Sequence, residues 1–437
     1  DWDPDMRSES AKIRRRERME QLKSLPLKWV STGYAAMIAT GPKRIVLASA
    51  LGLAFGYSSI GIFSFGIFVV PLSKEFGWGR GDMSFALTLM SITIIFLSPL
   101  AGSLLDRYGV RRVLIPSILC FGLAFPGLSL MTDSLLYYYS MYMLIALAGV
   151  CTTPASYSRV IVAWFDHRRG LALGVALAGI GAGTAIIPLF VELLTAKFGW
   201  RYAFLGISAL VLFISLPAVW AWIDDPVSDS PHGLVKEEDG FSFSEAIATR
   251  QFVFIAFSFL LLGIMSGGIL AHLVPLLTDR GITPTMAASV ASLLGVALIV
   301  ARLFTGYLLD RFFAPTIVAI FLSFPVLGFL ILLSGAAGAP AVFAVILIGL
   351  GIGAEMDFMS YLLSRYFGLH AFSKLYGMLY ASLTIGLSIG PIVMGYSQQL
   401  GGDYDLGLKA LLLSCAVAIP PLLLLGSYPS LPKVNLA

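Results

Sequence analysis

Twelve separate apolar stretches, each about as long as a membrane crossing, constrain this chain more than any other feature of its sequence. A helix needs about 20 mainly apolar residues to span the hydrocarbon core of a bilayer. The stretches cover residues 45–72, 83–105, 111–131, 135–158, 170–195, 202–223, 252–277, 285–309, 314–334, 340–364, 376–398 and 405–427. Charged residues make up 12% of the 437 positions, against roughly 25% in soluble domains. The sequence therefore predicts an all-α membrane protein with twelve transmembrane helices.

The distribution of lysine and arginine predicts which side of the membrane each loop occupies. An even number of spans puts both termini on one side, and that side carries 22 Lys and Arg residues against six on the other. Twelve remain against six when the basic tail before residue 45 is left out. Cytoplasmic loops carry the excess of positive charge, so we expect cytoplasmic termini and a location in the cell inner (plasma) membrane. The net charge of +4 then reflects topology, and no nucleic-acid partner is expected.

A polar segment in the middle of the chain divides the spans into two sets of six. Residues 224–250 are too polar and too rich in turn-forming residues to cross a bilayer. The tail before the first span is expected to be either a helix lying along the membrane surface or disordered. The expected organisation is a basic cytoplasmic tail at 1–44, a six-helix bundle at 45–223, a cytoplasmic linker at 224–250, a second six-helix bundle at 251–428 and a cytoplasmic tail at 429–437.

Two internal repeats support this division. The segment AGSLLDRYG at 101–109 recurs as TGYLLDRFF at 305–313, and the aspartates of the two copies are 204 positions apart. Glycines and a proline of the fifth span recur 203 positions later in the eleventh, beginning with Gly174 and Gly377. We therefore expect two pseudo-symmetric bundles, as in many secondary transporters, which bind substrate near the midplane between the halves.

The loop between the second and third spans reads GSLLDRYGVRR at 102–112. It resembles the GxxxDRxGxRR loop of the major facilitator superfamily. Small residues allow close helix contact, and Asp106 can pair with arginines at a helix end and so latch the cytoplasmic gate in one state. The alternative is a turn whose charges only set the topology. The gating candidates in this loop, in its partial copy and before the fifth span are Asp106, Arg107, Arg111, Arg112, Asp310, Arg311, Arg168 and Arg169.

A narrower resemblance comes from WFDHRRGLALG at 164–174, with further glycines at 179, 181 and 183. It is similar to a signature of the monocarboxylate transporter family and its bacterial oxalate/formate antiporter relatives, as is the segment from SIGIF at 59–63 to EFGW at 75–78. The superfamily resemblance covers the whole chain, and the narrower one covers spans 1 to 5 and 7 to 8 best. The resemblance implies the major facilitator fold and transport of a small organic acid.

Arg302 is the leading candidate for substrate binding. It lies eight residues before Asp310, which is about 12 Å along a helix and therefore near the bilayer centre. An arginine there is costly to insert and functional by default. In the family that the chain resembles, an arginine at this point of span 8 binds the substrate carboxylate, and a guanidinium can bind a carboxylate in a bidentate manner. The alternative is a structural salt bridge between helices.

The coupling ion is left open by one departure from the family pattern. Where mammalian relatives have an aspartate one turn before the arginine, associated with proton coupling, this chain has Leu298. A histidine titrates near neutral pH, and a carboxyl group in a dry cavity can do so as well. The candidates for proton coupling are Asp279, Glu355, Asp357 and His272. For Asp279 the alternative is an exposed loop position, and for His272 a packing role.

Further candidates lie on the tenth and fourth spans. Asp357 and Tyr361 are four residues apart and so share a helix face, whereas Glu355 points away from Asp357. One carboxylate would then bind substrate or a proton while the other holds the bundle together. Arg159, unless it only snorkels to the interface, would join Arg302 in balancing the two carboxylates. The substrate-binding candidates are Arg302, Tyr361, Asp357, His272, Arg159 and Tyr157.

Together these features predict a secondary active transporter of a small organic anion, either a monocarboxylate or an aromatic carboxylate. Proton-coupled symport by alternating access is the first expectation, with organic-anion exchange and proton-driven efflux as alternatives. A membrane sensor or enzyme on a transporter scaffold is least expected, because four His and three scattered Cys form no catalytic cluster or metal site and no phosphate-binding loop motif appears. The expected partners are the organic acid, protons or a counter-anion, and the lipid bilayer. No cofactor is expected, and the monomer should be functional.

Overall fold

The computed structural model describes residues 42–165, 168–224 and 240–432, and these ranges are almost entirely helical. In the described part of the chain, twelve helical segments are long and apolar enough to cross a membrane. They run from Lys43–Gly61 to Asp405–Leu423, and the predicted all-α fold with twelve spans is confirmed. The predicted surface helix before the first span and most of the linker lie outside the described residues.

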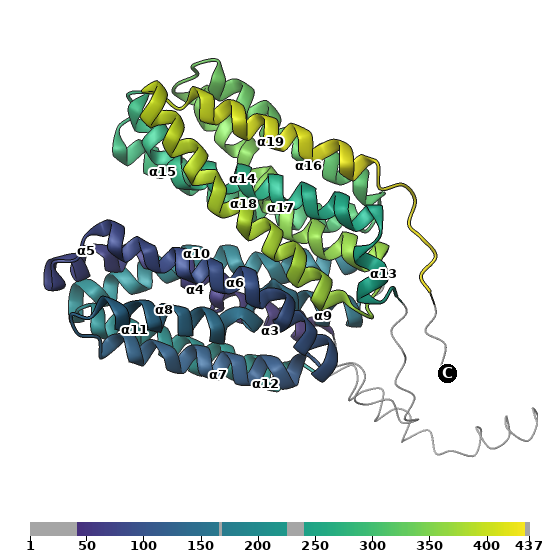
Figure 1. Cartoon of the computed structure of the whole chain (residues 1–437), viewed down its shortest axis with the longest axis horizontal. Coiled ribbons are helices and arrows are strands. Elements are labelled where there is room, and N and C mark those ends of the chain that lie inside the picture. The colour runs from purple at the N-terminus through teal and green to yellow at the C-terminus, as the bar shows by residue number, and fades with distance from the viewer. Residues whose placement is uncertain (1–41, 166–167, 225–239, 433–437) are drawn as a thin grey trace, which may run out of the picture. The chain divides into compact units, whose positions relative to one another are not determined.

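The first six spans are built from several broken helices. Element labels follow Figure 1. The elements are α3 (Pro42–Ala54), α4 (Tyr57–Phe63), α5 (Phe65–Phe76), α6 (Arg80–Tyr108), α7 (Val110–Ser129), α8 (Leu135–Gly149), the 3-10 helix η1 (Val150–Thr152), α9 (Pro154–Trp164), α10 (Arg169–Phe198), α11 (Trp200–Leu210), the π-helix η2 (Val211–Ser215) and α12 (Leu216–Trp222). The first, fourth and sixth spans are therefore interrupted where the sequence pattern predicts continuous helices.

The breaks in the first and fourth spans face each other. Gly56 precedes α4, and the backbone N–H of Tyr57 donates to Thr152 Oγ1 at 3.0 Å. Thr152 closes η1, and α9 then begins with Pro154, whose ring removes a backbone donor and so favours a helix start. A backbone donor left over at the first break is thus satisfied by a side chain from the second.

Each of the last six spans is a single uninterrupted helix. After the short α13 (Phe243–Ile247) they are α14 (Arg250–Asp279), α15 (Pro284–Leu309), α16 (Ala314–Leu333), α17 (Ala339–Tyr366), α18 (Phe372–Gly401) and α19 (Asp405–Leu423). Helices α14 and α18 pack closely: a Cβ added at Gly263 would lie 2.2 Å from the carbonyl oxygen of Leu383. Small residues of this kind are what permits close backbone contact between transmembrane helices.

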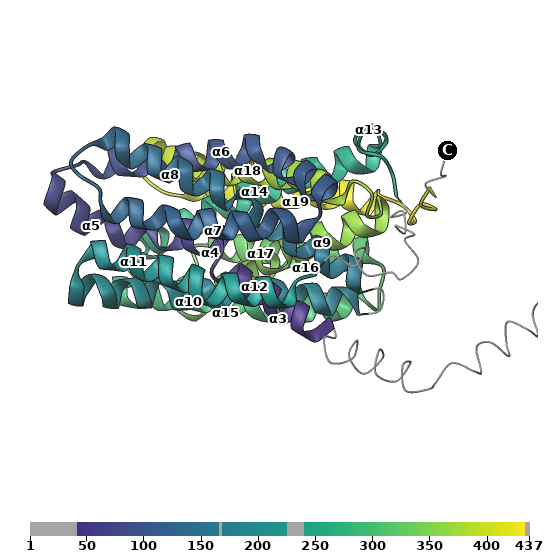
Figure 2. The ribbon, with the colours of Figure 1, turned by 90° about the horizontal axis from the view of Figure 1, so that it is seen from below.

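The two sets of spans form two bundles that meet mainly along two helix pairs. Figure 1 shows the first bundle, coloured purple to teal, beside the second, coloured green to yellow, and Figure 2 shows the long helices running side by side along one direction. Across the boundary α6 packs against α18, and α10 packs against α15. The linker end lies with the C-terminal segment, since Gly240 N–H donates to the carbonyl oxygen of Pro432 at 3.1 Å.

Candidate functional site

Asp106 joins the two bundles at one end of the spans. Its carboxylate accepts hydrogen bonds from the backbone N–H groups of Ser373 (3.0 Å) and Lys374 (2.9 Å), at the start of α18 in the other bundle. Arg159 of α9 lies 3.0 Å from the same carboxylate. A carboxylate at a helix N-terminus satisfies backbone donors that have no partner in the helix and interacts favourably with the helix dipole.

Asp310 makes the equivalent contact in the opposite direction. Its carboxylate accepts from the backbone N–H groups of Gly170 (2.7 Å) and Leu171 (3.0 Å), at the start of α10 in the first bundle. The two repeats found in the sequence therefore meet crosswise. Asp106, in the first LLDR segment, binds the start of α18, which carries the second copy of the glycine repeat. Asp310, in the second LLDR segment, binds the start of α10, which carries the first copy of the glycine repeat. We call the region of Asp106, Asp310 and these two helix starts the joined end.

Glycines permit the close approach at the joined end. A Cβ added at Gly102 would lie 2.2 Å from the carbonyl oxygen of Ser373, and one at Gly377 would lie 2.2 Å from that of Ser98. In the other helix pair, a Cβ added at Gly174 would lie 2.5 Å from the carbonyl oxygen of Arg302. Neither helix pair could accommodate a side chain at these positions without moving apart.

The arginines predicted to take part in gating have different surroundings. Arg159, which was a substrate-binding candidate and not a gating one, pairs with Asp106 and donates to the carbonyl oxygen of Leu369 at 2.7 Å. It therefore lies at the joined end and not beside Arg302 as a balanced core required. Arg111 forms an ion pair with Asp224 inside the first bundle. The remaining arginines are placed as follows: Arg107 over the ring of Tyr108, Arg311 over the ring of Tyr307, Arg169 donating to the carbonyl oxygen of Phe165, and Arg112 and Arg168 exposed.

Two proton-coupling candidates lie at the opposite end of the second bundle. His272 contacts the hydroxyl of Tyr404 (Nδ1, 3.3 Å) and the carbonyl oxygen of Pro391 (Nε2, 3.1 Å). Asp279 is exposed at the last residue of α14, and burial together with the nearby Asp279 charge raises the pKa of Tyr404. The structure therefore places both candidates near Tyr404, away from the joined end.

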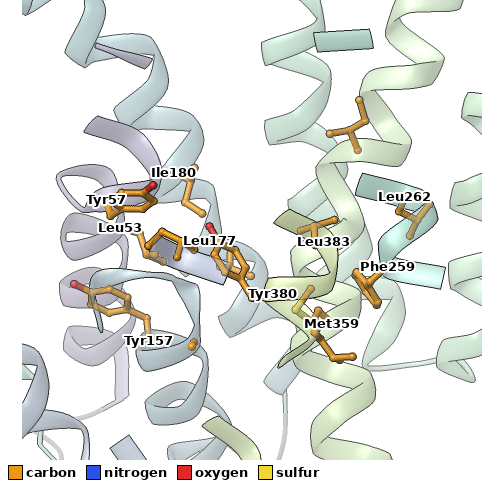
Figure 3. Packing of buried hydrophobic residues seen from close by; sticks show 14 of the residues in the cluster. Leu53, Tyr57, Tyr157, Leu177, Ile180, Phe259, Leu262, Met359, Tyr380 and Leu383 are labelled. Atoms are coloured by element: carbon orange, nitrogen blue, oxygen red, sulfur yellow. The ribbon is translucent and has the colours of Figure 1, made fainter. Parts of the chain in front are cut away.

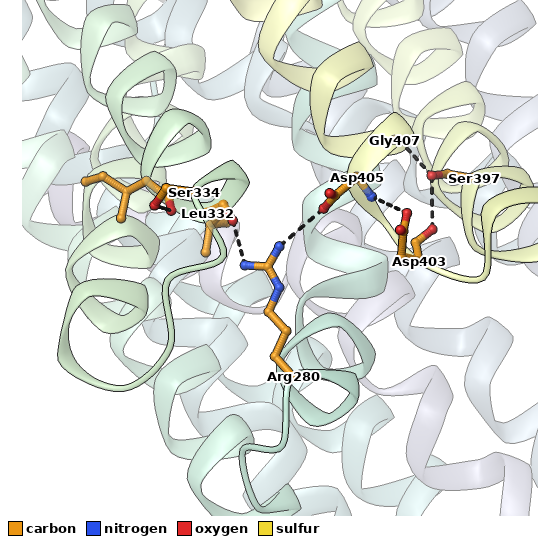
Figure 4. A network of polar contacts seen from close by, with 8 residues as sticks. Arg280, Leu332, Ser334, Ser397, Asp403, Asp405 and Gly407 are labelled. Carbon is orange, nitrogen blue, oxygen red and sulfur yellow. Dashed lines mark hydrogen bonds and ion pairs between the residues drawn. The ribbon is translucent and has the colours of Figure 1, made fainter.

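Arg280 ties this opposite end together. Its guanidinium donates to the carbonyl oxygen of Leu332 at 2.7 Å and lies 3.6 Å from Asp405, so it connects the end of α14 to α16 and α19 (Figure 4).

In the first bundle, the hydrogen bond from Trp200, followed by the smaller effect of Arg201, holds the pKa of Glu75 below its ordinary value. These contacts stay within one bundle.

Three charged side chains lie buried inside the spans of the second bundle. Arg302 on α15 is 8% exposed, and Glu355 and Asp357 on α17 are 3% and 0% exposed. The guanidinium interacts electrostatically with both carboxyl groups. Of the residues the structure describes, only Arg169 at the joined end is another charged side chain in the buried class.

The three charged groups are not fully paired with one another. Nη1 of Arg302 and both carboxyl oxygens of Asp357 are buried without a hydrogen-bond partner. Glu355, by contrast, accepts a hydrogen bond from Ser266 of α14 at 2.5 Å. Buried polar groups are almost always paired, and a buried charge without a partner is expensive. This cluster is therefore the place in the described chain where an incoming charged ligand would satisfy most unpaired groups.

Aromatic and aliphatic side chains lie on the first bundle's side of the boundary. Figure 3 shows Tyr57 and Leu177 of the first bundle facing Leu383 of the second, with Tyr380 between them. The side chains labelled on the first bundle's side of this view are apolar or aromatic.

Two predicted tyrosines have other neighbours. A Cβ added at Gly52 would lie 2.3 Å from the hydroxyl oxygen of Tyr157. The Tyr157 ring therefore packs against Gly52, inside the first bundle. The hydroxyl of Tyr361 accepts a hydrogen bond from Arg365 at 3.1 Å, one turn closer to the joined end than Asp357. Neither hydroxyl is shown bonded to Arg302 or Asp357.

Sequence reasoning missed three serines at these contacts. Ser266 binds Glu355, and Ser158 of the first bundle lies 2.9 Å, Oγ to Oγ, from Ser360 of the second. The available signal was a polar residue inside an otherwise apolar span, as in GIMSGGIL around Ser266. Serines are common in spans, and composition alone could not show which of them faced a charge or the other bundle.

Comparisons with known proteins agree with this architecture. The family model of the Major Facilitator Superfamily matches residues 49–391. The human protein "Monocarboxylate transporter 11" is 26% identical over 81% of this chain and 76% of its own length. The MFS-type transporter YhjX of Escherichia coli is 24% identical over 83% of this chain and 87% of its own length. The solved structure of E. coli FucP in an outward conformation has a TM-score of 0.70 at 15% identity, covering 89% of this chain and 99% of that one.

The family match covers well over half of the chain, and the solved structure shows the same fold. The relatives are transporters, so the expectation that the chain is not an enzyme is confirmed. The chain is a multi-pass membrane transporter that belongs to the major facilitator superfamily, in its monocarboxylate transporter-like branch.

Proposed function

We propose that this protein is a secondary active transporter that moves a small organic anion, a monocarboxylate or an aromatic carboxylate, together with protons. The carrying observation is the cluster of Arg302 and Asp357, which is buried inside the spans and has an unpaired donor on one residue and two unpaired acceptors on the other. A guanidinium is the side chain best suited to hold a planar carboxylate. The names of the relatives support a carboxylate as the substrate class.

The two carboxylates near Arg302 have separable roles in this proposal. Glu355 is held by Ser266 and serves to fix α17 against α14. Asp357 has no such bond and competes with the substrate carboxylate for the guanidinium. Protonation of Asp357 would remove that competition and leave Arg302 to the incoming anion. Proton uptake and substrate binding are thereby linked at one cation.

The contacts between the bundles support transport by alternating access. The joined end is closed by two carboxylate-to-helix contacts and by glycine-mediated packing. We infer that the state described is closed at the joined end. By the distribution of positive charge that end is cytoplasmic, so substrate would enter from outside.

Uptake into proteoliposomes tests the transport proposal. Purified protein would be reconstituted and given a panel of labelled monocarboxylates, aromatic carboxylates and dicarboxylates, with and without an imposed pH gradient. Accumulation driven by the gradient supports symport. Uptake only into vesicles preloaded with another anion would establish exchange in its place, and transport of uncharged compounds but no carboxylate would overturn the proposal.

The proposed gate makes a separate prediction. Replacing both Asp106 and Asp310 with asparagine should speed hydrogen exchange of the backbone amides at Gly170 and Ser373. Each contact contributes about 1–2 kcal/mol, so loss of one shifts the balance between closed and open states by about 5- to 30-fold. Hydrogen exchange with mass spectrometry measures this directly. The matched control is Asp133→Asn, since Asp133 is exposed in the loop between α7 and α8. Equal exchange rates at Gly170 and Ser373 in the double variant and in this control would refute the proposed latch.

A further inference from the structure

A groove of about 460 Å³ lies between the end of α15 and the first half of α16. Leu308 and Phe312 line it from one side, and Ile317, Ile320 and Phe321 line it from the other. Helices α15 and α16 each pack along α17 but scarcely touch each other, and the groove is the space this leaves. Neither the charged cluster nor the contacts of the joined end use it.

The groove is open at the lateral surface of the spans. Phe312 is 58% exposed and Ile320 is 48% exposed. Ile320 lies six residues after the start of α16, which is about 9 Å into the span at 1.5 Å per residue. A surface of this kind on a transmembrane helix faces hydrocarbon. The groove therefore runs from the membrane interface into the acyl-chain region.

A cation lies in the turn between α15 and α16, next to a residue that lines the groove. Arg311 directly precedes Phe312 and is exposed, and its guanidinium lies 4.2 Å from the centre of the Tyr307 ring. Tyr307 is itself 44% exposed, so this stacking holds the positive charge along the outer side of α15. Arginine binds phosphate with parallel charge-assisted hydrogen bonds, and basic sites beside transmembrane helices bind anionic headgroups.

We propose that this groove binds one anionic phospholipid, with an acyl chain along α16 and the phosphate on Arg311. The site has two parts, an apolar channel and a cation at its interfacial end, and a phospholipid has the same two parts in the same order. Free phosphate or glycerol phosphate would satisfy only the cation. A zwitterionic lipid would fill the channel with a weaker headgroup contact.

The bound lipid would also act on the closed state. Asp310, which binds the start of α10, directly precedes Arg311. The turn from α15 into α16 is held on its other side by the Tyr428 hydroxyl, which accepts from the backbone N–H of Ala314 at 3.0 Å. A lipid seated in the groove contacts both arms of this turn and fixes the position of Asp310. A ligand that prefers one state stabilises that state, so the lipid favours closure of the joined end.

Native mass spectrometry of the full chain tests the site. Phosphatidylglycerol would be titrated into detergent-solubilised protein, with phosphatidylcholine and glycerol 3-phosphate as comparison ligands. Ile320→Trp should fill the groove and weaken phosphatidylglycerol binding at least tenfold. Arg311→Gln should weaken it about fivefold, as expected for one cation near the headgroup, and Arg311→Lys by less. The matched control is Leu327→Trp, which adds the same bulk to an exposed position of α16 outside the groove.

The outcomes are separable from the identity of the transported substrate. Unchanged phosphatidylglycerol binding in both Ile320→Trp and Arg311→Gln overturns the site. Equal affinity for phosphatidylcholine overturns its preference for an anionic headgroup, and displacement by glycerol 3-phosphate overturns the role of the acyl chain. In the intact protein, phosphatidylglycerol should slow exchange of the Gly170 and Leu171 amides; no change would refute the link to the joined end.

Discussion

Replacing Arg302 with glutamine is expected to lower the initial rate of carboxylate uptake at least about 30-fold. Truncating one partner of a buried charge pair costs about 2–5 kcal/mol, and the substrate carboxylate would be the partner left without a cation. The residue lies buried inside the spans, and its Nη1 has no hydrogen-bond partner there. Uptake of labelled carboxylate into proteoliposomes measures the loss.

Two further variants separate this binding role from a structural one. Arg302→Lys keeps the charge but loses the planar fork, and should retain weak uptake with a raised KM. Arg302→Gln combined with Asp357→Asn removes the cation and one of the carboxyl groups it faces, and should restore thermal stability without restoring uptake. Uptake with unchanged rate and KM in a folded Arg302→Gln protein would remove the carboxylate-binding proposal.

Replacing Asp357 with asparagine is expected to abolish proton-driven accumulation while leaving exchange intact. A transporter that moves one proton with each substrate accumulates it about tenfold per unit of pH gradient, because 1.4 kcal/mol is a factor of ten. With asparagine at this position there is no group to protonate, so accumulation should fall to the external concentration. The measurement is the steady-state ratio of internal to external substrate at several imposed gradients, beside the rate of exchange with preloaded substrate.

Glu355→Gln is the matched control for this prediction. Glu355 belongs to the same cluster and the same helix, but it accepts a hydrogen bond from Ser266. A glutamine can still accept that bond, so the variant should keep its response to the pH gradient. If Glu355→Gln loses the response and Asp357→Asn keeps it, the roles assigned to the two carboxyl groups are reversed.

The sequence predicted the large elements because their signal is long and redundant. A stretch of 20 apolar residues is hard to mistake, and twelve spans follow from it. The breaks at Gly56 and Pro154 in the first and fourth spans could not be predicted, because glycine and proline also occur within continuous transmembrane helices. What decides the outcome is the contact between Tyr57 and Thr152, which lie far apart in the sequence.

The candidate site was predicted in part for the same reason. Arg302, Glu355 and Asp357 each stand out as charges inside apolar segments, and helix periodicity gives the face of each one. Periodicity does not say which helix stands opposite that face. Arg159 was therefore expected beside the carboxylates of α17, whereas the packing of α9 places it against Asp106. The choice between Glu355 and Asp357 likewise depends on Ser266, in another helix.

The crossed contacts of Asp106 and Asp310 have the form of an isologous interface, in which each partner offers the same surface to the other. The chain thus closes as a dimer of its own two halves would close. The charge that we propose to bind the substrate breaks this equivalence. Gly174 abuts the carbonyl oxygen of Arg302, and Gly377 abuts that of Ser98, so Ser98 occupies the matching place in the first half. A dimer of identical halves would carry two such arginines or none, whereas the fused chain carries one, and under the proposed function it would offer a single anion site in each cycle.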